Sequence, residues 1–110
     1  MLIAGRTITG ATAASWGLAN EAVPAERVLP VAMEWARDIV ENVSPLSAAA
    51  SKRILWRSLA STADEVDAME RHAHLALMGG PDAIEGGQAF VERRAPTWVS
   101  RVPDDWPFGE

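Results

Sequence analysis

The side chains most able to do chemistry in this sequence are two histidines, several carboxylates and two groups of cations. His72 and His74 are two residues apart, a spacing that points them to different faces of a helix, so they cannot form a two-ligand metal site. Glu70 precedes His74 by four residues, so the imidazole can simply lie beside a carboxylate on the solvent side. We therefore predict no metal site and no catalytic histidine.

The carboxylates and glycines give no catalytic or phosphate-binding pattern either. Glu85 and Glu92 are seven residues apart on one helical face, but an acid/base pair needs a shaped, water-poor pocket to separate its two pKa values. The glycine doublets at 79–80 and 86–87 match neither the dinucleotide-binding nor the P-loop pattern. The sequence thus predicts no catalytic residue and no nucleotide loop of those types.

The cations allow two interpretations. Lys52, Arg53 and Arg57 fall in the C-terminal half of a predicted helix, where the macrodipole favours positive charge. Arg93 and Arg94 follow Phe90 by about one turn, and an aromatic ring beside guanidinium groups can stack a base while the cations meet phosphate. An arginine pair at a helix end can equally be structural, so both interpretations stay open.

The elements that would position these residues are helices. Capping and turn residues delimit them: Thr9 and Gly17 bound a short helix, Ser44–Pro45 opens another, and Thr62 with Glu65 forms a capping box. The predicted helices are 10–16, 25–43, 45–60, 63–77 and 83–94, with an extended stretch at 18–23, and the doublet at 86–87 suggests close backbone approach. The fold class predicted is all-α, a small bundle of four to five helices with one short extended segment.

The five tryptophans are many for this length. Trp16 and Trp35 are expected in the core, which is the default for large aromatics. Trp98 and Trp106 lie outside any periodic helix, so we expect them to contact another chain or a missing domain.

Composition limits the class of protein further. A chain of 110 residues can form one domain with a thin core, and its net charge of -5 argues against nucleic-acid binding. The absence of cysteine excludes disulfides and thiolate sites, and the first residues show no export signal or membrane helix, so we expect a cytoplasmic protein. The apolar start at Leu2 and Ile3 has nothing ahead to cover it, which indicates a longer parent protein.

The order of four segments resembles one family. Ala4–Thr9, Ala14–Pro24, Ala49–Arg53 and Glu85–Pro96, taken together, are similar to the crotonase, or enoyl-CoA hydratase/isomerase, family. The likeness covers 2–98 and only the C-terminal third of a family member. We accordingly divide the chain into a C-terminal helical domain of a crotonase-like protein at 1–98 and an irregular segment rich in Trp and Pro at 99–110.

The resemblance implies a role without catalysis. The family's oxyanion hole and its usual acid/base carboxylates belong to an N-terminal core that has no counterpart here, so this chain alone is expected to be inactive. The family's C-terminal helices build trimers or dimers of trimers, and a Phe and a Lys of the last helix contact the adenosine part of coenzyme A (CoA). The matching residues here are Phe90 and Arg93.

The function expected from this resemblance is oligomerisation and contact with the edge of CoA. The parent would hydrate an acyl-CoA thioester or shift its double bond, with no metal or redox cofactor required and no nucleic-acid or membrane partner. The alternative is a stand-alone helical module that associates with itself and does not bind CoA.

Overall fold

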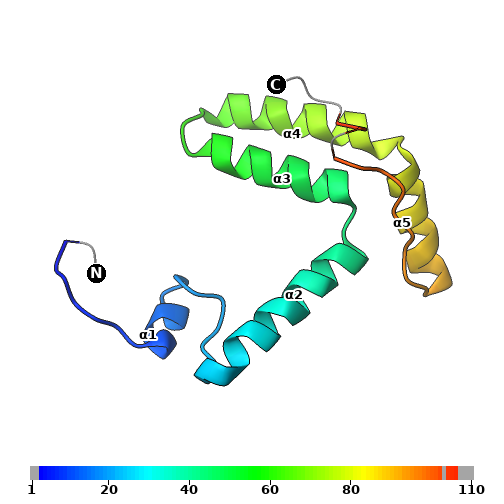
Figure 1. Cartoon of the computed structure of the whole chain (residues 1–110). Coiled ribbons are helices and arrows are strands. Elements are labelled where there is room, and N and C mark those ends of the chain that lie inside the picture. The colour runs from blue at the N-terminus through cyan, green and yellow to red at the C-terminus, as the bar shows by residue number, and fades with distance from the viewer. Residues whose placement is uncertain (1–2, 103, 107–110) are drawn as a thin grey trace. The chain divides into compact units, whose positions relative to one another are not determined.

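A computed structural model describes residues 3–102 and 104–106, and in them the chain is helical. The elements are α1 (Gly10–Ser15), the 3-10 turn η1 (Ala25–Arg27), α2 (Val28–Asn42), α3 (Pro45–Ser58), α4 (Ala63–Met78) and α5 (Pro81–Glu92) (Figure 1). These described residues contain no β-strand. The predicted all-α class with five helices is confirmed.

The predicted caps form as the residue types require. The Thr9 hydroxyl accepts the Thr12 amide at 3.1 Å, and the chain leaves α1 through Gly17 at φ 72°, where glycine has no steric penalty. At α4 the Thr62 amide donates to Glu65 Oε2 at 2.7 Å while the Glu65 amide donates to Thr62 Oγ1 at 3.4 Å. The Thr62 amide and hydroxyl lower the pKa of Glu65 below its ordinary value.

Helix boundaries differ from the predicted ones by a few residues. The second predicted helix, at 25–43, begins as η1 before it becomes α2, and α3 ends at Ser58. The last helix starts two residues early at Pro81, a residue suited to the first turn, and ends at Glu92 because Arg93 turns into the left-handed region. Residues 18–23 contain bends at 18–20 and no helix.

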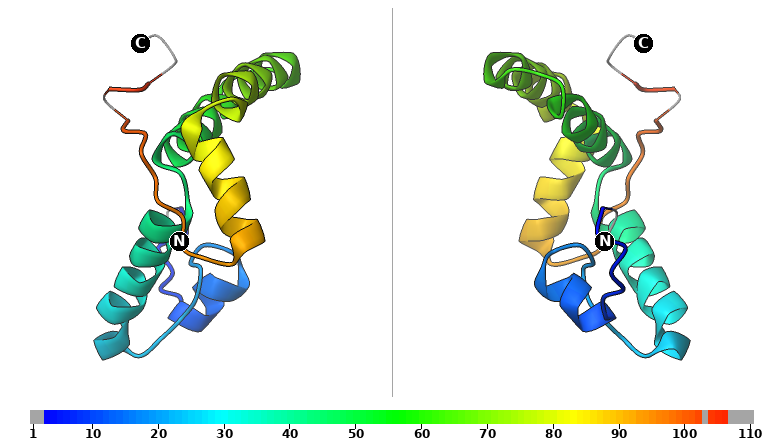
Figure 2. Two further views of the ribbon diagram at one scale, coloured as in Figure 1. Left: turned by 90° about the vertical axis from the view of Figure 1, so that its right-hand side faces the viewer. Right: turned by 90° about the vertical axis from the view of Figure 1, so that its left-hand side faces the viewer.

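The chain divides into two compact units, Met1–Ala36 and Arg37–Glu110. In the first unit, a Cβ added to Gly10 would lie 3.4 Å from the Ala22 side chain, so the start of α1 approaches the segment that follows it. In the second unit, α3 and α4 lie side by side as an antiparallel pair, and α5 contacts α4 (Figures 1 and 2).

The described residues have a thin apolar core, and the buried apolar side chains all belong to the second unit. They are Leu46 and Ala50 on α3, Ala73 on α4 and Ala89 on α5, each at most 7% exposed. Three of the four are alanines, so the helices approach closely but bury little apolar surface. Among the described residues, 20 large apolar side chains are exposed. Much of the surface is therefore suited to contact with other protein.

The expected core positions of Trp16 and Trp35 are wrong. Trp16 and Trp35 are 67% and 51% exposed instead of buried, because nothing in the described residues covers them. Trp98 and Trp106 have partners within their own chain: the Trp98 indole donates to the Glu41 carbonyl at 3.1 Å, and the Arg53 guanidinium lies 5.6 Å from the centre of the Trp106 ring. The non-periodic segment that carries them folds back onto the second unit.

Candidate functional site

The C-terminal end of α5 brings together the two residues singled out as binding residues. Phe90 lies in the last turn of α5, and Arg93 is the residue that caps the end of this helix. Phe90 is 86% exposed, although a phenylalanine with this much ring in water would ordinarily be covered. Arg93 is also exposed, and within the described part of the chain its guanidinium makes no hydrogen bond or ion pair.

The backbone at Arg93 fixes how the helix ends. Its φ of 55° and ψ of 41° lie in the left-handed region, and it is the one non-glycine residue with positive φ among those the structure describes. The Arg93 amide donates to the Phe90 carbonyl at 3.3 Å and the Arg94 amide to the Ala89 carbonyl at 3.1 Å. These bonds satisfy carbonyls that the last turn of α5 would otherwise leave open.

Arg94 has a different environment from its neighbour. Its guanidinium makes a bidentate pair with Glu85, with Nη1–Oε1 at 2.5 Å and Nη2–Oε2 at 3.0 Å, and Nε donates to Glu92 Oε2 at 2.6 Å. Glu85 Oε1 also accepts the Thr97 amide at 2.6 Å. Arg94 and the Thr97 amide hold the pKa of Glu85 down at about 2, and the two carboxylates raise the pKa of Arg94 above its ordinary value.

The start of α5 carries a second carboxylate that sequence reasoning missed. Asp82 is 7% exposed, and it accepts the Ser44 hydroxyl at 2.9 Å, the Val99 amide at 2.9 Å and the Ser100 amide at 3.3 Å. Burial alone would raise the pKa of Asp82, but the hydrogen bonds from Val99, Ser44 and Ser100 outweigh it and keep the carboxyl below its ordinary value. The available signal was the Pro81–Asp82 helix start together with the Ser44 cap position.

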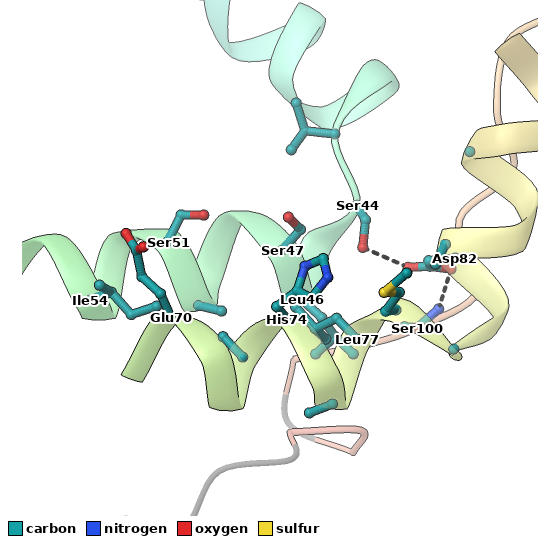
Figure 3. Close-up of a pocket in the computed structure, with 18 of the residues that line it drawn as sticks. Ser44, Leu46, Ser47, Ser51, Ile54, Glu70, His74, Leu77, Asp82 and Ser100 are labelled. Carbon is teal, nitrogen blue, oxygen red and sulfur yellow. Dashed lines mark hydrogen bonds between the residues drawn. The ribbon is translucent and has the colours of Figure 1, made fainter. Parts of the chain in front are cut away.

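A groove follows the α3–α4 pair and reaches the start of α5. It has a volume of about 1420 Å³, more than a closed pocket for one small molecule usually has. Ile54 and Leu77 line it together with serines such as Ser47 and Ser51. Ser44, Asp82 and Ser100 stand at one end (Figure 3). At that end the Ser44 hydroxyl is already paired with the Asp82 carboxylate.

Glu70 and His74 also line this groove, from α4 (Figure 3). His74 is exposed, and no hydrogen bond or ion pair joins it to Glu70 in the residues that the structure describes. Those residues contain no group of three or more His, Asp or Glu side chains placed to hold a metal ion.

The remaining candidate cations do not converge on one site. Lys52 and Arg57 are exposed on α3, while Arg53 lies over the Trp106 ring. Of the two glycines predicted to allow close approach, Gly86 does so, because a Cβ there would lie 3.4 Å from Trp98 Cη2, whereas nothing lies within 4 Å of a Cβ at Gly87. The end of α5 is thus the place where candidate binding residues meet.

The helical arrangement and its sequence identify the family. Residues 1–101 match the model of the enoyl-CoA hydratase/isomerase family, so the chain belongs to that family and the resemblance noted above is confirmed. Carnitinyl-CoA dehydratases are among the relatives: that of Proteus mirabilis is 34% identical over 105 residues, and that of Salmonella typhi is 33% identical over the same length.

Two solved structures share the fold. A probable enoyl-CoA hydratase/isomerase from Mycobacterium abscessus is 43% identical with a TM-score of 0.84, and an enoyl-CoA hydratase/isomerase from Mycobacterium paratuberculosis is 30% identical with a TM-score of 0.74. Each match covers 88% of this chain and 38% of the solved one. Against the two dehydratases the match covers 92% of this chain and 40% of theirs, so the chain spans well under half the length of its relatives.

Across the residues that the structure describes, every helix is too short or too polar to cross a bilayer.

Proposed function

We propose that this chain is the C-terminal helical part of an enoyl-CoA hydratase/isomerase-like enzyme, where it serves subunit assembly and contact with the edge of CoA. The substrate of the whole enzyme is an acyl-CoA thioester, which is hydrated or isomerised at its double bond. The catalytic groups come from another segment, and the assembly is a homo-oligomer, a trimer or a dimer of trimers. The observation that supports this proposal most is the family match, which covers 38–40% of the length of the relatives.

The assembly role is supported by the balance of buried and exposed apolar residues. Four apolar residues are buried among those described, while Val40, Leu59 and Val91 are each 73% exposed or more. Apolar surface in contact with water costs roughly 25 cal/mol per Å², so covering side chains of this kind stabilises an assembly strongly. A monomer would leave them in water.

The CoA contact is supported by the chemistry at the end of α5. CoA carries an adenine ring and phosphate groups, and the exposed Phe90 ring can stack on a base while the Arg93 guanidinium meets a phosphate. Arginine in place of the family's lysine keeps the charge and adds a planar, bidentate donor.

The test replaces the matched segment of the Mycobacterium abscessus protein with this chain. We expect the hybrid to sediment as an oligomer, bind CoA and turn over crotonyl-CoA, while the isolated chain shows no turnover. In the hybrid, the double substitution Phe90→Ala with Arg93→Ala should weaken CoA binding about tenfold or more, since each charge-assisted or stacking contact contributes ~1 kcal/mol.

The matched control removes the same kinds of group elsewhere. His74→Ala with Arg57→Ala deletes one exposed ring of α4 and one exposed arginine at the end of α3. It should leave CoA affinity unchanged. Turnover by the isolated chain would contradict the proposal that the catalytic groups come from another segment. Equal CoA affinity in the two double variants would show that Phe90 and Arg93 do not belong to the site. An isolated chain that self-associates beside a hybrid that ignores CoA would favour the stand-alone module.

A further inference from the structure

The two adjacent arginines after α5 differ in the bonds that their side chains make. Arg94 has three charge-assisted bonds to two carboxylates, whereas the Arg93 guanidinium has no hydrogen bond or ion pair with any residue that the structure describes. In a continuing helix, two adjacent arginines would differ only in the direction that their side chains take around the helix axis. Here the difference arises at the left-handed backbone of Arg93, which ends the helix and sends Arg94 back along α5 toward Glu85.

That backbone conformation is unfavourable for arginine. A left-handed residue with a Cβ costs about 1–2 kcal/mol, and helices that end in this way usually have glycine at the position. No glycine is present, so surrounding contacts must hold the conformation. The bonds nearest to it are those of Arg94, which is tied to Glu85 two turns back and to Glu92 in the last turn.

Glu85 extends this restraint to the chain that follows. It accepts both Arg94 and the Thr97 amide, and its side chain is 18% exposed, so it is less open to water than its partners. An isolated surface pair contributes little, but a bidentate pair within a network has its geometry fixed by several bonds at once. Arg93 is therefore held between α5 and a segment anchored to the same carboxylate.

We infer that Arg94 and Glu85 are positioning residues for the CoA edge, because they hold Arg93 in the left-handed conformation in which its guanidinium has no partner among the described residues. This inference rests on the proposed function of Phe90 and Arg93. It assigns Arg94 no contact with CoA. The consequence is that loss of the Arg94–Glu85 pair weakens CoA binding only through Arg93.

The experiment uses the full 110-residue chain, isotopically labelled, with CoA as the probe. The Arg93 backbone dihedral angles are measured by NMR coupling constants and chemical shifts of this chain, and CoA affinity is measured by titrating the hybrid enzyme described above with the same substitutions. Arg94→Lys keeps the charge but lacks Nε and the planar fork, so the bidentate geometry is lost. Arg71→Lys is the matched control, because it alters an exposed pair with Asp67 at 2.7 Å within α4.

We expect Arg94→Lys to abolish the left-handed signature at Arg93 and to weaken CoA binding about fivefold, the loss of roughly one ordered contact, while Arg71→Lys changes neither. With Arg93 already replaced by alanine, Arg94→Lys should have no further effect on affinity. A retained left-handed Arg93, an unchanged affinity, or an added loss in the Arg93→Ala background would each overturn the inference. If the hybrid with Phe90→Ala and Arg93→Ala binds CoA as tightly as the unsubstituted hybrid, the binding assignment itself fails, and that result is seen before any Arg94 variant is made.

Discussion

The α3–α4 pair and the junction between α5 and the residues after it are held together by opposite means. The helix pair packs through small apolar side chains, with Ala50 and Ala73 buried and few polar bonds between the helices. The junction is made by two carboxylates of α5, Asp82 and Glu85, which accept backbone amides of the following segment. One contact depends on close approach of two surfaces and the other on a few directed bonds.

This difference explains how a segment without any period is held in place. Residues 97–100 have no helix or strand to satisfy their amides, so the carboxylates of α5 take that role. The Trp98 indole adds a bond to the Glu41 carbonyl and lies against Gly86. We expect single substitutions at the junction to cost more than those in the helix pair, because a lost acceptor leaves several donors unpaired at once.

The largest effect is expected for Asp82→Ala. This change removes the acceptor of the Ser44 hydroxyl and of the Val99 and Ser100 amides, of which the Ser100 group is buried, so we expect a loss of about 2–4 kcal/mol in the free energy of unfolding. Urea unfolding followed by circular dichroism measures it. Asp82→Asn keeps an acceptor oxygen and should cost less; a loss under about 0.5 kcal/mol for the alanine variant would contradict the role of the junction.

Acid should weaken the same junction, and the sign follows from the pKa values. The ordinary pKa is 3.8 for the carboxyl of Asp82 and 4.5 for that of Glu85, and in the folded chain both pKa values are lower. The contributions of the two carboxylates to stability are therefore complete above the ordinary values. They are lost as the pH falls toward the native values, about 2 for Glu85. The free energy of unfolding should fall between pH 5 and pH 3, roughly the upper part of this pH range, and it should fall less in the Asp82→Asn variant than in the unsubstituted chain.

The helix pair should respond to size instead. Ala50 is 3% exposed, and a leucine there forces α3 and α4 apart, at a cost of about 1–3 kcal/mol. Ala68→Leu, on an exposed position of α4, is the control and should change stability by less than about 0.5 kcal/mol. Equal stabilities of the two leucine variants would show that the alanine contact does not limit the approach of the helices.

Much of the helix pair could be predicted from the sequence, because its signals are local. The Thr62–Glu65 capping box, the Ser44–Pro45 start and the stop at Gly79–Gly80 depend on residues within a few positions of one another. The candidate site could be predicted only by resemblance, which selected Phe90 and Arg93. Nothing in their spacing alone separates a binding arginine from a structural one.

The junction could not be predicted, because its bonds join residues far apart in sequence. Ser44 and Asp82 are 38 positions apart, and Trp98 bonds to a carbonyl 57 positions earlier. The expected core positions of Trp16 and Trp35 failed for a related reason: amphipathic spacing shows that a face is apolar, but it does not show whether the covering surface belongs to the same chain. Burial is a property of the assembled surfaces.

The smallest effect separates the two glycines that lie between the carboxylates and the end of α5. In a helix, Gly→Ala stabilises by about 0.5–1 kcal/mol, and at Gly87 nothing within 4 Å opposes the new methyl group, so Gly87→Ala should gain that amount. At Gly86 the methyl group would meet the Trp98 ring at 3.4 Å, so the gain should be smaller or absent because the indole must shift while keeping its bond to Glu41. Thermal unfolding of both variants measures the difference. Because the two substitutions share the same intrinsic helix preference, any gap between them reports the contact of Trp98 with α5, and equal gains would mean that the ring does not press on this helix in solution.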